Sequence, residues 1–143
     1  MQALFLAQSD TTAGFLCQDP HKINRVKQRG SQKVLIEVDS LATLQTFTRT
    51  PSRFKNHIRR SKKTTFIYPN GLAIRVVKDE QHLKFLTRFG WMYSSSANRT
   101  KESYDDTFAS QAVEVIIKDR RGFFEGRASK MMKLNSKIQK RIR

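Results

Sequence analysis

Two short segments of the 143-residue chain carry side chains that suit the binding of phosphate groups. The first is Lys27-Gln28-Arg29, with Lys33 just beyond it, where a predicted helix leads into a predicted strand. Sheets of α/β proteins bind ligands beyond their strand ends, and Lys and Arg are common partners of polyphosphates. The second segment is the hydroxyl-rich turn 94–100, which contains Ser96 and Asn98. Its small side chains would let backbone N–H groups approach a phosphate, although an isolated serine run is more often an ordinary turn.

Other kinds of catalytic site find little support in the sequence. His21, His57 and His82 are far apart and lack partners at metal-binding spacing, so we expect exposed or half-buried histidines and no metal site. Neither a Walker nor a Rossmann glycine motif occurs. The single Cys17 has no matched base, which indicates a small buried side chain rather than a nucleophile. It cannot form an internal disulfide, which favours a reducing compartment, the cytoplasm.

The charge of the chain favours a polyanionic partner. Lys and Arg number 28 against 12 Asp and Glu, which gives a net charge of +16. A single basic run is usually a solvated face, but here three runs carry most of the charge, and their self-repulsion would be relieved by RNA or a nucleotide. The densest run predicts RNA contacts at Arg53, Arg59, Arg60, Lys62 and Lys63. We expect no membrane partner, because the sequence has neither a long basic amphipathic helix nor an 18-residue apolar stretch.

The length suits one domain, which we place at residues 1–134 and follow with a basic C-terminal tail, 135–143. A first helix is predicted to begin at Asp19-Pro20 and to end at Gly30, and two more to begin at Ser40 and at Pro51. A fourth helix is predicted to begin at Asp79 and to end at Gly90, with Leu83, Leu86 and Phe89 facing inward. Strands are predicted at 3–7, 33–38, 64–68, 72–77, 91–95 and 112–117, with Asn70-Gly71 as a hairpin turn. Residues 131–134 and the basic end are predicted to form short strands or a tail. The pattern predicts an α/β fold with a single twisted mixed sheet flanked by helices.

Five segments, in this order along residues 4–134, resemble motifs of the YrdC/YciO-like family, the threonylcarbamoyl-AMP synthases. They are the counterpart of an early proline-threonine-acid-threonine segment at 8–15, the Lys-x-Arg motif at 27–29, a strand arginine at Arg75, the Thr-Ser-Ala-Asn motif at 95–98 and a late Pro-Ser-Thr segment at 128–130. The resemblance implies a YrdC-like fold.

The resemblance also implies an activity, the nucleotidyl transfer that condenses threonine, bicarbonate and ATP into threonylcarbamoyl-adenylate for modification of tRNA. Under it, Lys27 and Arg29 would be catalytic, and the nucleotide would bind to Lys27, Arg29, Lys33, Ser96 and Asn98. Threonine would bind to Ser9, Thr11, Arg75 and Ser129. ATP would enter as a substrate with Mg²⁺, no tightly bound cofactor is implied, and the threonylcarbamoyl-transfer complex would be a partner.

The sequence departs from the family pattern mainly around the amino-acid pocket. Gln8 replaces the leading proline, Ala13 replaces a tyrosine, and Ser61-Lys62-Lys63 stands where Pro-Gly-Pro is usual. Two hypotheses therefore remain, an adenylate synthase and a non-catalytic relative that binds double-stranded RNA or tRNA through shape and phosphate contacts. The retained Lys-x-Arg and Ser-x-Asn pairs favour the enzyme.

Overall fold

The computed structural model describes residues 2–135 and 139–143. Nine strands are present in this part of the chain: β1 Phe5–Gln8, β2 Ala13–Cys17, β3 Leu35–Val38, β4 Thr64–Ile67, β5 Ala73–Val76, β6 Trp91–Ser96, β7 Val115–Ile117, β8 Lys130–Leu134 and β9 Gln139–Arg141. Five α-helices accompany them: α1 Pro20–Val26, α2 Leu41–Phe47, α3 Lys55–Arg60, α4 Glu80–Leu86 and α5 Asp106–Ala112, with a short 3₁₀ turn, η1, at Ser52–Phe54.

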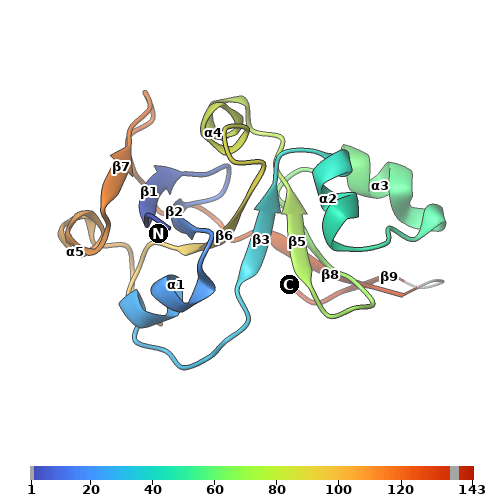
Figure 1. The fold of residues 1–143 in the computed structure, drawn as a ribbon, viewed down its shortest axis with the longest axis horizontal. Coiled ribbons are helices and arrows are strands. Elements are labelled where there is room, and N and C mark those ends of the chain that lie inside the picture. Colours follow the sequence, from blue (N-terminus) through green and yellow to red (C-terminus); the bar gives the residue numbers. More distant parts are fainter. Residues whose placement is uncertain (1, 136–138) are drawn as a thin grey trace.

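The strands form one mixed sheet in the order β7-β1-β2-β6-β3-β5-β4-β8-β9 (Figure 1). The pairs β1–β7, β3–β5 and β4–β8 are parallel, and the other pairs are antiparallel. Parallel partners lie far apart in sequence because a crossover must connect them. The prediction of an α/β fold with one mixed sheet flanked by helices is confirmed.

Helix caps and one tight turn produce the local structure as the sequence predicts. Asp19 is the N-cap of α1, and its carboxylate accepts a hydrogen bond from the His21 N–H at 3.0 Å. Ser40 and Asp79 cap α2 and α4 in the same way. Asn70-Gly71 turns β4 into the antiparallel β5, with Gly71 at φ +89°, a conformation that glycine adopts without strain. These short-range signals are confirmed.

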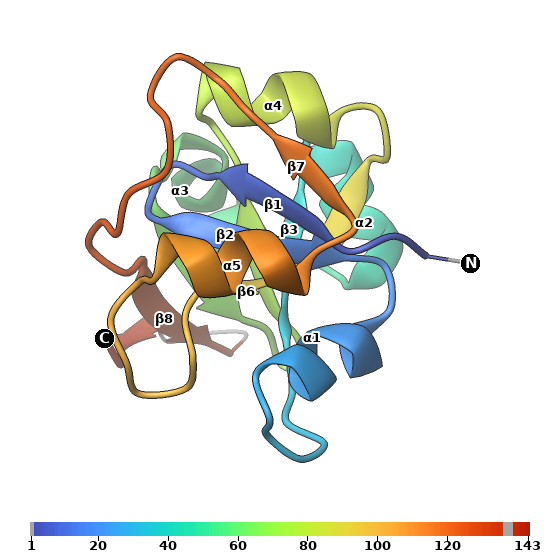
Figure 2. The ribbon, with the colours of Figure 1, turned by 90° about the vertical axis from the view of Figure 1, so that its left-hand side faces the viewer.

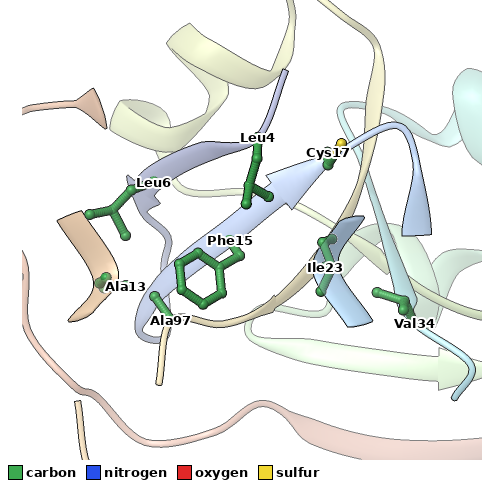
Figure 3. Packing of buried hydrophobic residues seen from close by; sticks show 9 residues of the cluster. Leu4, Leu6, Ala13, Phe15, Cys17, Ile23, Val34 and Ala97 are labelled. Atoms are coloured by element: carbon green, nitrogen blue, oxygen red, sulfur yellow. The ribbon is translucent and has the colours of Figure 1, made fainter. Parts of the chain in front are cut away.

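The helices cover the two faces of the sheet unequally. Phe15 of β2 packs with Ile23 of α1, and Figure 3 shows it at the centre of a cluster that includes the buried Cys17. Its neighbour Leu16 packs instead against Leu86 of α4. Because successive strand residues point to opposite faces, α4 lies on the face opposite α1 and α5 (Figure 2).

The remaining helices leave one part of the sheet uncovered. Helices α2 and α3 contribute Leu44 and Ile58 to a cluster with Ile36 and Ile74. This cluster lies on the face of β3 and β5 opposite to the one that Arg75 faces. On the face that Arg75 faces, α4 covers only one end of the sheet. The uncovered part of this face forms the floor of a cavity.

Several elements differ from the prediction. Helix α1 ends at Val26 rather than at Gly30, because Gln28 adopts a left-handed backbone conformation with φ +52° that cannot continue a helix. Phe89 lies beyond α4 and is 39% exposed, while Phe85 is the buried aromatic residue of that helix. Strand β2 and helix α5 were not predicted, and α5 occupies the residues just before the strand expected at 112–117.

The segment expected as a basic tail, 135–143, contains an edge strand of the sheet. Strand β9 pairs antiparallel with β8, which places Lys140 opposite Lys133 and Arg141 opposite Met132. The part of this segment at 136–138 lies outside the described residues. No helix in the described part of the chain is long and apolar enough to cross a membrane.

Candidate functional site

A cavity of about 640 Å³ lies on the sheet face that α4 leaves uncovered. It is bounded by the strand ends of β2 and β6, the α1–β3 connection, the faces of β3 and β5, and the start of β8. Eight of the nine nucleotide- and threonine-binding residues predicted from the sequence line it: Ser9, Thr11, Lys27, Arg29, Lys33, Arg75, Ser96 and Ser129. The ninth, Asn98, is not among the lining residues, but its side chain contacts Lys27 beside the cavity.

Lys27 joins the two segments that the sequence singled out. Its ammonium donates hydrogen bonds to the Ser96 carbonyl at 2.7 Å and to the Ser96 hydroxyl at 3.2 Å, and it lies 3.4 Å from Oδ1 of Asn98. The side chain is largely buried because α1 ends directly against the end of β6. Burial, with a smaller contribution from the nearby Arg29 guanidinium, lowers the pKa of Lys27 to about 8.

Arg29 and Lys33 add two more positive charges to the lining of the same cavity. Nε of Arg29 donates to Oδ1 of Asn24 at 2.7 Å, which holds the guanidinium against the end of α1. Among the described residues, Lys27, Arg29 and Lys33 form no ion pair with a carboxylate. Three uncompensated cations in one concavity create a potential that attracts an anion.

Hydroxyl groups gather at the other end of the cavity. The Ser9 and Thr11 hydroxyls lie 3.1 Å apart in the turn between β1 and β2. The Ser129 hydroxyl lies 2.9 Å from that of Thr65, at the start of β8. The parallel pairing of β4 with β8 brings these last two residues together, although 64 positions separate them.

Arg75 lies on the cavity floor but already has carboxylate partners within the protein. Its guanidinium is paired with Glu37 and lies 3.7 Å from Oδ1 of Asp10, and it donates to the Thr11 hydroxyl at 3.2 Å. Burial alone would raise the pKa of Glu37, but Arg75 and His82 outweigh it and hold that pKa well below its usual range. Burial raises the pKa of Asp10, against the opposing charge of Arg75. The charge of Arg75 is therefore largely balanced before any ligand binds.

His82 corrects one expectation of the sequence analysis. It is only 1% exposed, whereas the sequence predicted exposed or half-buried histidines, and its Nε2 lies 2.5 Å from Oε1 of Glu37. His21 and His57 are exposed as expected. Glu37 is fully buried beneath α4 and needs a second polar partner besides Arg75. His82 of α4 is that partner, and it is buried for this reason.

Two residues near the hydroxyl end were missed by sequence reasoning. Glu37 carried a signal, because a carboxylate inside the apolar strand Leu35–Val38 must find a buried partner. Arg143 carried none, since it lies beyond the expected domain. Its Nε donates to the Ser129 carbonyl at 2.9 Å, and its Nη2 donates to the Ser129 hydroxyl at 3.1 Å. Arg143 thus lines the cavity without an ion-pair partner among the described residues.

The predicted RNA contacts lie outside the cavity. Arg53, Arg59, Arg60, Lys62 and Lys63 are exposed on η1, on α3 and on the turn into β4. The backbone carbonyl of Lys63 accepts a hydrogen bond from the Lys130 N–H at 3.0 Å, so this basic run adjoins the start of β8. In the part of the chain that the structure describes, no group of three or more His, Cys, Asp or Glu side chains could hold a metal ion.

No protein-family model and no curated protein sequence matches the chain. Solved structures do match. A Sua5 variant from P. abyssi superposes with a TM-score of 0.77 at 17% identity, over 99% of this chain and 49% of that one. YciO from E. coli gives 0.75 at 15% identity, over 99% and 82%.

A third match is full-length HypF in its phosphate- and nucleotide-bound form, with a TM-score of 0.77 at 11% identity. The match covers 99% of this chain and 26% of that one, so the chain spans about a quarter of HypF and about half of Sua5. Nearly the whole chain follows the same arrangement of strands and helices as these proteins. The chain therefore has the YrdC-like fold.

Proposed function

We propose that this protein is a threonylcarbamoyl-AMP synthase that condenses threonine, bicarbonate and ATP. The observation that carries the proposal is the meeting of Lys27 with Ser96 and Asn98, at 2.7 to 3.4 Å, at the cationic end of a cavity whose other end bears hydroxyl groups. A polyphosphate suits the first end, and a small hydroxy amino acid suits the second. The nucleotide-bound state of HypF, which has the same fold over this length, is consistent with the proposal.

The reaction would need positioning and charge stabilisation rather than a protein nucleophile. Bicarbonate would react with the threonine amine to give a carbamate and water, and a carbamate oxygen would attack the α-phosphorus of ATP. The bond from that phosphorus to the bridging oxygen would break, and pyrophosphate would leave with the negative charge. Lys27, Arg29 and Lys33 would stabilise that charge, because their own charges are uncompensated in the free protein. Mg²⁺ would arrive with ATP.

The hydroxyl end would hold threonine. Ser9, Thr11 and Ser129 would hydrogen-bond its polar groups, and the Arg75 guanidinium would orient it from the cavity floor. The ion pair with Glu37 already holds the Arg75 guanidinium in place. Little conformational entropy of the Arg75 side chain would therefore be lost when the ligand binds.

A pyrophosphate-release assay with ATP, bicarbonate and threonine, each omitted in turn, tests the proposal. We expect release only with all three present, and its loss in Arg29→Gln. Arg59→Gln removes an equal charge from the exposed surface of α3 and should retain the activity. Release that continues without threonine, or equal losses in both variants, would contradict the proposal.

A second candidate function, binding of structured RNA, rests on the edge of the sheet. Lys133 and Lys140 lie directly opposite each other on β8 and β9, and both are exposed. Like charges in cross-strand positions destabilise a sheet, and a polyanion across them would reverse that effect. The adjoining run at Lys62 and Lys63 would extend the same surface.

A further inference from the structure

The two edges of the sheet differ in chemical character. One edge is β9, whose residues Gln139-Lys140-Arg141 carry the charged side chains that discourage pairing with another strand. The other edge is β7, which pairs with β1 alone among the described strands (Figure 1). β7 consists of Val115, Ile116 and Ile117, and the first two are exposed to 37% and 39%. An apolar edge strand of this kind can accept a further strand.

The backbone of β7 has hydrogen-bonding groups that point away from the sheet. The Val115 N–H donates to the Leu4 carbonyl at 3.2 Å, so the backbone groups of Val115 face β1. Successive residues of a strand direct their backbone groups to opposite edges, so the N–H and C=O of Ile116 face outward. Figure 2 looks onto this edge and shows β7 between α4 and α5. The outer edge of Ile116 can therefore form two backbone hydrogen bonds with another strand.

Exposed apolar side chains lie on both faces of the sheet at this edge. Val115 is in register with Phe5 of β1, and the Phe5 ring lies 5.4 Å from the ring of the exposed Phe89, just beyond α4. Ile116 is in register with Leu6, which packs on the face that α1 and α5 cover. A strand added beside β7 would remove apolar surface from water on both faces.

The charges that flank β7 indicate which strand fits beside it. Glu114 precedes the strand and Lys118 follows it, each two positions from Ile116, and both are exposed. The Lys118 ammonium has no ion pair with a described carboxylate. Oε1 of Glu114 accepts from Lys22 at 2.6 Å and from the Leu4 N–H at 3.2 Å, whereas Oε2 has no partner among the described residues. One cation and one carboxylate oxygen are thus left for a partner strand.

These charges are complementary to themselves in one arrangement. When two copies of the segment pair antiparallel about Ile116, Glu114 of each copy lies opposite Lys118 of the other, and apolar residues lie opposite apolar residues. Opposite charges in cross-strand positions stabilise a pair of strands, and like charges destabilise it. A parallel pair in register would place Glu114 opposite Glu114 and Lys118 opposite Lys118. The pattern therefore favours an antiparallel second copy.

We propose that β7 pairs antiparallel with β7 of a second copy of this chain, about a two-fold axis at Ile116. The two sheets then form one continuous sheet. Ile116 exchanges both outward backbone hydrogen bonds with Ile116 of the second copy, and Val115 lies opposite Ile117. A two-fold contact of this kind uses the same surface on both copies, which the symmetry of the charges satisfies. No residue of β7 lines the 640 Å³ cavity, so this inference does not depend on the proposed synthase activity.

Salt should strengthen this dimer. Each copy has a net charge of +16, so the two copies repel each other over a long range, and added salt screens that repulsion. The contact itself is short and mainly apolar, which places it among weak interfaces. A complex that RNA bridges would respond in the opposite sense, because salt weakens contacts with phosphates. The sign of the salt dependence therefore separates the two kinds of complex.

The test is sedimentation equilibrium of the full chain, freed of nucleic acid, from about 10 μM to about 1 mM, a range that suits weak interfaces. We expect a monomer–dimer equilibrium. Ile116→Lys places two ammonium groups at the two-fold axis and should weaken the dimer about tenfold or more. Ile142→Lys adds the same charge at an apolar residue that is 52% exposed just after β9, and it should dimerise like the wild type.

A charge exchange tests the register and keeps the proposal testable if Ile116→Lys fails to fold. Glu114→Lys and Lys118→Glu each place like charges opposite each other in their own dimers, so each variant alone should dimerise less than the wild type. An equimolar mixture of the two should recover dimerisation, because every flanking pair then joins opposite charges. A wild type that stays monomeric at the highest concentration, equal dimerisation in Ile116→Lys and Ile142→Lys, no recovery in the mixture, or a dimer that salt dissociates would overturn the proposal.

Discussion

The ammonium of Lys27 lies 2.7 Å from the carbonyl oxygen of Ser96, although 69 positions separate the two residues. This contact fixes the end of α1 against the end of β6, and it is reinforced by the Thr100 hydroxyl, which donates to the Lys27 carbonyl at 2.8 Å. A buried ammonium held by neutral oxygens lacks a full counter-charge. The phosphates of a nucleotide would supply one.

This arrangement predicts how ATP affinity depends on pH. The pKa of Lys27 in the free protein is about 8, below the ordinary lysine value of 10.5, because burial and the nearby Arg29 disfavour the charged form. Below pH 8 the ammonium is charged and would bind a phosphate of ATP under the proposed function. Above pH 8 it loses its proton, and ATP affinity should fall by up to about tenfold per pH unit. Calorimetric titrations at pH 7, 8 and 9 measure this effect.

Lys27→Arg is the matched variant, because a guanidinium remains charged across this range. Its ATP affinity should change little between pH 7 and 9. A wild-type affinity that is constant with pH, or an equal decline in Lys27→Arg, would show that another group controls binding.

The buried pairing of Glu37 with Arg75 predicts a large loss of stability in Glu37→Gln. Removing the carboxylate takes away the nearest counter-charge of the buried Arg75, which keeps only Asp10 at 3.7 Å, and breaking comparable buried pairs costs about 3–5 kcal/mol. Urea unfolding measures the change. Glu102→Gln, at an exposed position, serves as the control and should change the free energy of unfolding by less than about 0.5 kcal/mol.

The same pairing predicts acid sensitivity. The pKa of Glu37 is lower in the folded protein than its unfolded value of 4.5, so the unfolded chain takes up the proton first. The stabilisation is complete above pH 4.5 and is lost as the pH falls below it. The stability of Glu37→Gln should therefore depend less on pH between 5 and 3 than that of the wild type. Parallel pH profiles would contradict the assignment.

Short-range signals in the sequence were sufficient for the elements that begin at a cap or close at a tight turn. Asp19, Ser40 and Asp79 each lie before a helix, and Asn70-Gly71 closes a hairpin, because such residues act through hydrogen bonds within a few positions. Helix α5 carried the same signal in Asp105, whose carboxylate accepts from the Thr107 and Phe108 N–H groups, and it could have been predicted.

The composition of the site was partly predictable, but its electrostatics were not. The residue types and their order along the chain identified eight residues that the structure brings together around one cavity. The pairing that balances the charge of Arg75 depends on the parallel register of β3 with β5, which puts Glu37 opposite Arg75. Arg143 enters the cavity only because β9 pairs with β8. Such long-range pairings leave no local pattern in the sequence.

Gly126 should be intolerant of any side chain. A Cβ atom at this position would lie 1.8 Å from the carbonyl oxygen of Thr11, so the segment that leads into β8 could not stay against the β1–β2 turn. Gly126→Ala should destabilise the protein by about 1–3 kcal/mol and weaken threonine binding, since Thr11 lines the cavity. Gly30→Ala, where a Cβ meets nothing within 4 Å, is the control. Equal stability of the two variants by urea unfolding would contradict this packing.

The last prediction concerns RNA and the basic edge of the sheet. Lys133 and Lys140 repel each other across β8 and β9, so Lys133→Gln/Lys140→Gln should leave the free protein as stable as the wild type or slightly more stable. If RNA phosphates lie over this pair, the variant should bind a labelled duplex more weakly. Its slope of log affinity against log salt should be shallower by about one to two units, because about one counterion fewer is released per lost contact.

Fluorescence anisotropy across a salt series measures both slopes, with Lys78→Gln/Lys101→Gln as a control that removes two exposed charges elsewhere. Arg59→Gln/Arg60→Gln tests the alternative site on α3 that the sequence predicts. A shallower slope only in the α3 variant would move the interface to that helix, because the charge lost is equal and only its position differs. A slope unchanged in both variants, with wild-type binding intact, would exclude both surfaces and direct attention to the cations of the cavity. If the wild type fails to bind RNA even at low salt, the second candidate function is wrong.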